Sequence, residues 1–387
     1  MHQSIPQLLA FVLGLCLLQA CSDNSDTFVI RDPSLAIYND PGTGPWAPVS
    51  TEAVATECGL DPAILAEIDA SATYSYLVVR YGKLCHEFYH PNDPGQNELA
   101  NNYSSTKTLA AALVGRAMLL SEDLPQPLSD TDRMDDWVEN ISFNKDALVA
   151  HVLAMIGFND NLSVGARRWN YDANGSREIN RLRDVVEAVM AQDPAQFSDA
   201  RTAGEFAQRE IFDRLGMRYS NWDGISFASS WHSNMRDMAR LGLLLLHDGV
   251  WEQQRLIRED WVYKMTHAAF EDANAGYGYL TWTAADGNYY VPGLDVPLPV
   301  SLSDCMPPAL WREYPHGLSE STDCNAGAQY SCQQTYDVGA FAALGAGGQN
   351  ISVHRALQLV VVTRNAGSLA FINDGWDLMR SALIALD

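Results

Sequence analysis

The sequence predicts a mixed α/β (α+β) domain in which an antiparallel sheet is flanked by terminal helices and interrupted by an inserted all-helical subdomain. Three observations favour this class. Residues 75–90 and 351–363 are rich in strand-forming residues, the segments between them are mostly helix-forming, and an amphipathic stretch at 371–386 closes the chain. With 387 residues, 47% of them hydrophobic and 19% charged, the chain has enough apolar material for a large core.

The N-terminus has the pattern of an export signal. Its longest apolar run spans residues 8–18, too short to cross a bilayer, and Leu18-Gln19-Ala20 precede Cys21 as in a bacterial lipobox. We therefore expect a lipoprotein signal peptide at 1–20, a lipid on Cys21 that anchors the exported protein at the periplasmic face of a membrane, and a flexible tether at 21–50. The alternative is an ordinary cleaved signal or a short anchor, with Cys21 an incidental thiol.

Five of the seven cysteines remain once Cys16 leaves with the signal and Cys21 carries lipid. An exported protein can oxidise them, but five is an odd number, so at most two intramolecular bridges form. We favour Cys58 with Cys85, and one pair within the late group of Cys305, Cys324 and Cys332. The spacing fits no zinc template, so we expect no metal.

The formal net charge of −23 lies wholly on the mature chain, because residues 1–20 contain no Asp, Glu, Lys or Arg. Nucleic acid and anionic lipid head groups would be repelled. We therefore expect no nucleic-acid partner, and a membrane association only through the N-terminal lipid.

The folded domain is expected at 51–387. A hairpin should turn at Tyr81-Gly82-Lys83, and a buried helix should run from Ser104 to about Ser121, opening a helical subdomain at about 104–260. Further helices are predicted at 145–156, 178–191, 203–215, 233–247 and 371–386, and further strands at 277–283 and 351–363, the latter turning near His354-Arg355.

One long stretch, 284–337, interrupts this pattern. It contains six prolines and three cysteines and shows no clear periodicity. Structureless loops of this length are uncommon in compact domains. We interpret it as an insertion that forms a partly stapled lid near a cleft, or else a surface excursion that touches nothing.

The first buried helix begins with Ser104-Ser105-Thr106-Lys107, where Ser104 and Lys107 share one helical face. A serine hydroxyl becomes a good nucleophile when a neighbouring base takes its proton, and a lysine serves as that base only if its pKa falls towards neutrality. Burial in the apolar helix would lower it. Taken alone, this spacing also fits a solvated first turn with a capping serine.

The surrounding sequence resembles the penicillin-recognising superfamily: class C β-lactamases, serine esterases of β-lactamase fold and 6-aminohexanoate-dimer hydrolases. The resemblance covers roughly residues 74–386 and rests on the Ser-x-x-Lys helix start and on landmarks in the expected order at 205–217, 233–251, 276–279 and 345–349. It implies a β-lactamase/transpeptidase-like fold and a serine hydrolase that cleaves an ester or amide through an acyl-enzyme on Ser104, without a cofactor.

The family's second motif is a tyrosine followed two places later by Asn or Ser. Tyr171 matches the tyrosine, and the resemblance implies that it relays protons to the leaving group. Ala173 departs from the motif, and Asn174 would replace it only through a shifted loop. The alternative for Tyr171 is a packing role.

The third motif, Lys or His followed by Ser or Thr and Gly, aligns with Ala343-Leu344-Gly345. The resemblance places this strand beside the site, with the amides of Ser104 and Ala346 forming an oxyanion hole. The structural alternative is a tight turn only. Because Ala343 lacks the cation that holds a β-lactam carboxylate, we do not expect antibiotic hydrolysis.

Four further residues have two possible roles. Arg167 and Arg168 either bind a substrate carboxylate or lie on a solvated loop. Trp231 and His232 either line the pocket or pack in the interior. The alternative enzyme is a β-lactamase or a DD-peptidase that acts on peptidoglycan. The alternative outside the enzymes is a catalytically silent lipoprotein that uses the same cleft for binding.

Overall fold

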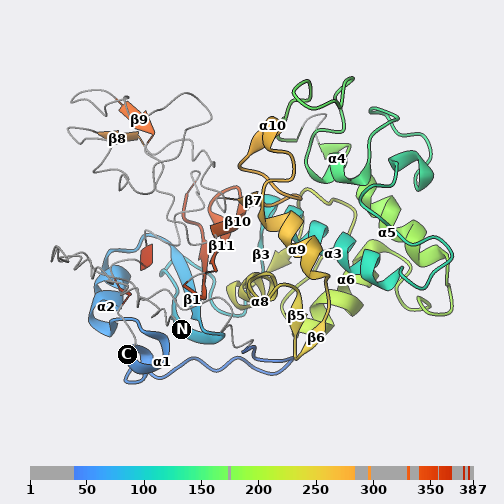
Figure 1. Ribbon diagram of the computed structural model, residues 1–387. Coiled ribbons are helices and arrows are strands. Elements are labelled where there is room, and N and C mark those ends of the chain that lie inside the picture. The colour runs from blue at the N-terminus through green and yellow to red at the C-terminus, as the bar shows by residue number, and fades with distance from the viewer. Residues whose placement is uncertain are drawn as a thin grey trace, which may run out of the picture.

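The computed structural model describes residues 39–172, 176–283, 295–297, 329–331, 340–355, 357–367, 378–379 and 382–383. Within this part of the chain a six-stranded antiparallel sheet lies at the centre (Figure 1), with strand order β2-β1-β12-β11-β10-β7. Strands from before residue 90 therefore lie beside strands from after residue 340, as predicted. The strands are β1 (Ser75–Arg80), β2 (Lys83–Phe88), β7 (Trp282–Thr283), β10 (Ala340–Gly345), β11 (Gln349–His354) and β12 (Leu359–Arg364).

Both faces of the sheet are covered. The central strands are buried along their whole length and send alternate side chains to opposite sides, so that Leu77 joins one apolar core and Tyr76 the other. Helix α8 (Met235–Leu246) packs on the first face, whereas α1 (Val54–Cys58) and α2 (Pro62–Ser71) lie on the opposite side (Figure 1). A sheet buried on both faces explains why its strands read as continuous apolar runs.

Most of the described helices lie between β2 and β7. Helix α3 is buried from Thr106 to Met118 and contacts α5 and α9, which makes it the centre of the helical layer. The helices are α3 (Thr106–Leu120), α4 (Val149–Leu153), α5 (Arg181–Ala191), α6 (Ala203–Ala207), the π-helical turn η5 (Gln208–Phe212), α7 (Asp213–Leu215), α9 (Glu259–Thr266) and α10 (Glu271–Asn274).

Short elements complete the described structure. The 3-10 turns are η2 (Tyr103–Ser105) and η3 (Met134–Asp136). The short strands pair two by two: β3 (Ala100–Asn101) with β4 (His232–Ser233), β5 (Val250–Trp251) with β6 (Gln254–Arg255), and β8 (Asp295–Pro297) with β9 (Gln329–Ser331).

Two predicted elements are shorter than the sequence indicates. The expected helix at 145–156 is α-helical only at Val149–Leu153. Leu148 before it has an extended backbone, and Met155 after it takes a left-handed conformation with φ of 57°. The expected strand at 277–283 is extended only at Trp282–Thr283. Before it the chain turns, with Leu280 at φ of 50° and the Gly278 amide donating to the Thr281 carbonyl.

The disulfide between Cys58 and Cys85 is formed and joins the end of α1 to β2, which confirms that pairing. The signal, Cys21 and the three late cysteines lie outside the described residues, as does nearly all of the 284–337 insertion. Of the predicted closing helix, only 378–379 are described as helical. Among the helices that the structure describes, none combines the length and apolarity that crossing a bilayer demands.

The last part of the predicted tether packs onto the domain. Trp46 is only 6% exposed, and Arg240 donates to the carbonyl oxygens of Gly42 and Gly44, each at 2.6 Å. Ordered packing therefore begins before Thr51.

Candidate active site

Ser104 lies in η2, the tight turn that leads into α3. Tyr103 adopts φ of 46°, an uncommon backbone conformation for a residue with a bulky side chain. Local hydrogen bonds hold this turn: the Tyr103 amide donates to Asn101 Oδ1 at 2.8 Å, and the Asn102 amide donates to the Trp231 carbonyl at 2.8 Å. The turn thus presents Ser104 at the start of a rigid, buried helix.

Lys107 lies one helical turn after Ser104, and the spacing brings the two side chains into contact. Its Nζ is 3.0 Å from Ser104 Oγ and donates to the Ala228 carbonyl oxygen at 3.0 Å. Only 2% of its side chain is exposed. Burial lowers the pKa of Lys107, because an ammonium in an apolar environment is poorly solvated. The shift has the direction that a general base requires.

Tyr171 reaches the same two residues. Its ring centroid lies 4.9 Å from Lys107 Nζ. Burial raises the pKa of Tyr171, whereas the neighbouring Ser104 side chain opposes that rise. The hydroxyl is therefore protonated near neutral pH, as a donor to a leaving group must be. Ser104, Lys107 and Tyr171 are thus brought together from two separate segments.

Asp172 is a residue of this cluster that the sequence did not reveal. Its Oδ2 lies 3.2 Å from Lys107 Nζ. Ala173 and Asn174, the residues weighed for the second motif, lie outside the described residues. The signal in the sequence is an acidic residue next to the tyrosine, whereas the family motif concerns the position two residues after the tyrosine.

The predicted third motif lies at the end of β10, against η2. Gly345 is the point of closest approach, because a Cβ there would lie 2.2 Å from the Asn102 carbonyl oxygen and 3.1 Å from Ser105 Oγ. A larger residue would push the strand away from the serine turn. Ala343 is buried, Leu344 is half-buried and Ala346 is exposed in the turn that follows.

Four aromatic rings form one cluster beside the serine and lysine: Trp169, Tyr171, Tyr277 and Trp282. Tyr171 stacks on Trp282 with centroids 5.5 Å apart, and every other pair in the cluster lies within 6.4 Å. The cluster fixes the ring of Tyr171 and gives this side of the site an apolar wall.

The remaining candidates have structural partners. Arg167 pairs with Asp272 and lies over the ring of Phe270, so its charge is already engaged. Arg168 donates to the carbonyl of Gly165 on an exposed loop. Trp231 is fully buried, and His232 contacts the Ser230 carbonyl at 2.9 Å. These contacts favour a structural role for each of the four residues.

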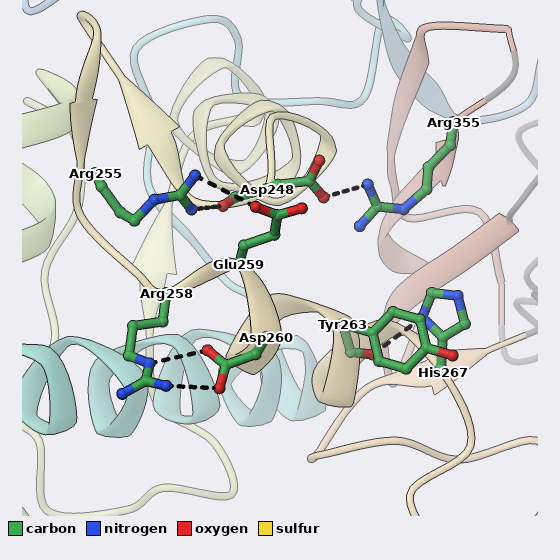
Figure 2. A pocket seen from close by; sticks show the side chains of 8 residues that line it. All are labelled: Asp248, Arg255, Arg258, Glu259, Asp260, Tyr263, His267 and Arg355. Carbon is green, nitrogen blue, oxygen red and sulfur yellow. Dashed lines mark hydrogen bonds and ion pairs between the residues drawn. The ribbon is translucent and has the colours of Figure 1, made fainter. Parts of the chain in front are cut away.

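A hollow of about 690 Å³ elsewhere on the molecule contains none of these residues (Figure 2). Its charges neutralise one another: Arg355 pairs with Asp248 at 2.6 Å and Arg258 with Asp260 at 2.9 Å. The hollow is lined by Asp248, Arg255, Arg258, Glu259, Asp260, Tyr263, His267 and Arg355. Within the described ranges, no cluster of three or more His, Cys, Asp or Glu side chains has the arrangement of a metal site.

Comparison of the sequence with models of known protein families and with curated proteins finds no match. Solved structures do match. A protein of Bacteroides dorei provisionally named a β-lactamase superposes with a TM-score of 0.54 at 13% identity, covering 83% of this chain and 97% of that one. A provisionally named 6-aminohexanoate-dimer hydrolase of Bacillus anthracis gives 0.54 at 14% identity, covering 89% and 88%.

A β-lactamase from Mycobacterium bovis superposes with a TM-score of 0.50 at 13% identity, covering 82% of this chain and 96% of that one. At such low identity the likeness concerns the fold. These superpositions extend over most of each chain, and the central antiparallel sheet with its helical layer agrees with them. The chain has a β-lactamase-like fold.

Proposed function

We propose that the protein is a serine hydrolase that cleaves an ester or amide through a covalent acyl-enzyme on Ser104. The observation that carries the proposal is the contact between Ser104 Oγ and Lys107 Nζ at 3.0 Å, with the lysine buried and its pKa lowered. A neutral amine at that position accepts the serine proton as the hydroxyl attacks. The named hydrolases that share the fold support the same class.

The proposed reaction has two stages, acylation and deacylation, and needs no cofactor. In acylation, a bond forms between Ser104 Oγ and the carbonyl carbon, the proton of Ser104 passes to Lys107, and the bond to the leaving group breaks. Tyr171, whose ring lies beside Lys107, passes a proton to the departing oxygen or nitrogen, and the proton held on Lys107 then restores the tyrosine hydroxyl. In deacylation, water gives a proton to Lys107 as its oxygen attacks the acyl carbon. The bond to Ser104 Oγ then breaks, the proton on Lys107 passes to that oxygen, and the acid is released.

The oxyanion of each tetrahedral intermediate would accept hydrogen bonds from the backbone amides of Ser104 and Ala346. This assignment is supported by the packing of β10 on η2 and by the lack of a side chain at Gly345, which together place the two segments against each other. The role belongs to backbone groups, so the departures at Ala343 and Leu344 do not affect it.

The substrate class is a neutral or apolar acyl compound. Ala343 supplies no cation, Arg167 is paired with Asp272, and the wall beside the serine is aromatic. None of these favours a carboxylate-bearing antibiotic or peptide, so an esterase or amidase is preferred over a β-lactamase or DD-peptidase.

One experiment tests the proposal. The purified domain is treated with a fluorophosphonate probe, and its activity is measured on p-nitrophenyl esters, short linear amides and nitrocefin. We expect a probe adduct on Ser104 and turnover of esters or amides. An adduct at another residue contradicts the assignment of the nucleophile, and a folded protein that takes no probe and turns over nothing supports the silent binder.

We further propose that the enzyme is exported and held at a membrane through a lipid on Cys21. The support is the sequence pattern of Leu18-Gln19-Ala20 before Cys21. Metabolic labelling with an alkyne-bearing palmitate tests it: label should enter the intact chain, and Cys21→Ala should abolish the labelling. Persistent labelling of that variant would exclude Cys21 as the anchor.

A further inference from the structure

We propose that Asp172 is a positioning residue of the Ser104–Lys107 pair: its carboxylate directs the lysine lone pair at the serine and sets the pH at which the amine becomes a base. The inference rests on the proposed function, because it requires that Lys107 take the proton of Ser104.

The geometry around Lys107 Nζ carries the first half of the proposal. Three oxygen atoms surround this nitrogen: Ser104 Oγ at 3.0 Å, the Ala228 carbonyl at 3.0 Å and Asp172 Oδ2 at 3.2 Å. An ammonium has three N–H donors, which matches the number of oxygen atoms around this nitrogen. When the amine is neutral, two N–H groups remain.

Of the three acceptors, the Ala228 carbonyl and the Asp172 carboxylate can only accept, whereas the Ser104 hydroxyl can also donate. The two N–H groups of the neutral amine therefore stay with Ala228 and Asp172, and the lone pair faces Ser104. Without the carboxylate, one N–H group has no fixed acceptor and the lone pair loses its fixed direction. Asp172 thus fixes the direction of the Lys107 lone pair as well as contacting the amine.

The charges around Lys107 carry the second half. Among the described residues, Asp172 is the charged group that acts on Lys107, and it raises the pKa that burial lowers. Tyr171 faces the amine with its ring. Strand β10 brings no titratable side chain. The helices packed on α3 carry charged residues that are paired elsewhere. These pairs are Arg181 and Arg183 with Asp184 on α5, Lys264 of α9 with Asp130, and Glu210 of η5 with Arg116.

The backbone of Asp172 is consistent with a specific role. It has φ of 52°, a left-handed conformation that aspartate tolerates better than most residues. Its Oδ1 makes no hydrogen bond within the described ranges, and its side chain is 31% exposed. The carboxylate therefore does not cap its own loop through that oxygen, and its other oxygen contacts Lys107.

The test is the pH dependence of fluorophosphonate labelling of Ser104, measured as a second-order rate by intact-mass spectrometry of the folded protein. Labelling forms the bond from Ser104 Oγ to phosphorus, breaks the phosphorus–fluorine bond, releases fluoride and passes the serine proton to Lys107. The rate falls at acidic pH because the ammonium has no lone pair. The wild type is compared with Asp172→Asn and Asp172→Glu.

Asp272→Asn is the matched control. Asp272 anchors the loop that precedes Tyr171, through Arg167 and the Gly165 amide, but does not contact Lys107. We expect Asp172→Asn to move the acidic limb of the pH–rate profile, where labelling slows as the pH falls, to lower pH by roughly 1 to 3 pH units. Removing an opposite charge at this distance lowers the pKa of an amine by about that much. Asp172→Glu and Asp272→Asn should leave the limb near its wild-type position.

An unshifted limb in Asp172→Asn, or an equal shift in Asp272→Asn, would overturn the inference. If Asp172→Asn fails to fold by circular dichroism, the comparison uses Asp172→Glu and Asp172→Ala, where only the alanine variant should show the shift. The two proposals fail separately: an unlabelled Ser104 in the wild type removes the proposed function, whereas labelling with unshifted limbs removes only the role of Asp172.

Discussion

The hydroxyl of Ser105 donates a hydrogen bond to the carbonyl oxygen of Gln349, which ties the turn bearing Ser104 to strand β11. Ser105 is fully buried, so its oxygen cannot act on a substrate. Two adjacent serines therefore have different tasks: Ser104 faces Lys107, and Ser105 fixes the turn to the sheet.

Substitution of these two serines should separate activity from stability. Ser104→Ala should lower turnover of any accepted substrate by at least about 10³-fold with the fold intact, because covalent catalysis needs that oxygen. Ser105→Ala should retain much of the activity but lose about 0.5 to 1.5 kcal/mol of unfolding free energy, because its hydrogen bond to the Gln349 carbonyl is lost. Steady-state kinetics and urea unfolding measure the two effects. Equal losses of activity would contradict the separation.

The two proposed proton carriers should behave as one unit. Lys107→Ala and Tyr171→Phe should each slow acylation, with the lysine variant the more impaired because its amine lies beside Ser104. The double variant should be little worse than Lys107→Ala alone, since groups that move one proton together lose their effect together. Stopped-flow measurement of acylation provides the rates. Independent, multiplicative losses would indicate that one of the two side chains only packs.

The local part of the site was accessible from the sequence. A serine and a lysine three residues apart at a helix start must share a face, and the apolar residues that follow predict burial. The hairpin at Tyr81-Gly82 followed in the same way from short-range signals.

The contact of Asp172 with Lys107 was not accessible, because it depends on how a loop more than 60 residues downstream places a left-handed aspartate. The segment 277–283 shows the same limit. Its strand-forming residues predict a strand, but the chain turns before Trp282, and Tyr277 packs against Trp169 and Trp282.

Gly345 offers a test of how closely β10 must approach the serine turn. Gly345→Ala should reduce fluorophosphonate labelling by about 10²-fold, because its Cβ would lie 2.2 Å from the Asn102 carbonyl oxygen and must displace the turn. Gly44→Ala is a suitable control, since the atom nearest to a Cβ there is 3.9 Å away. A Gly345 variant labelled as fast as this control would show that the approach is not required.

The disulfide should stabilise the fold without taking part in catalysis. Cys58 and Cys85 are 27 residues apart in the sequence, and closing a loop of that size is worth about 3.5 kcal/mol in the chain-entropy account. Because both side chains are buried, the double variant Cys58→Ala/Cys85→Ala is a cleaner test than added reductant. We expect a lower melting temperature and unchanged labelling of Ser104 at 25 °C. An unchanged melting temperature would contradict the prediction.

Glu178 should make the stability of the protein fall as the pH rises. This side chain is 3% exposed, and burial raises the pKa of its carboxyl to about 8. In the unfolded chain a glutamate has a pKa of about 4.3. Between these two values the native state keeps a proton that the unfolded state has lost, so the unfolding free energy decreases with pH, by at most about 1.4 kcal/mol per pH unit for one group.

Glu178→Gln removes this titration while keeping the size and polarity of the side chain. The variant and the wild type should be close in stability near pH 5, and the variant should be the more stable at pH 8, where the native wild type must either hold the proton or bury a charge. Urea unfolding at pH 5, 6, 7 and 8 gives the two curves. The difference between them isolates Glu178 from every other titrating group, and parallel curves would mean that its carboxyl is already ionised in the native protein at pH 5.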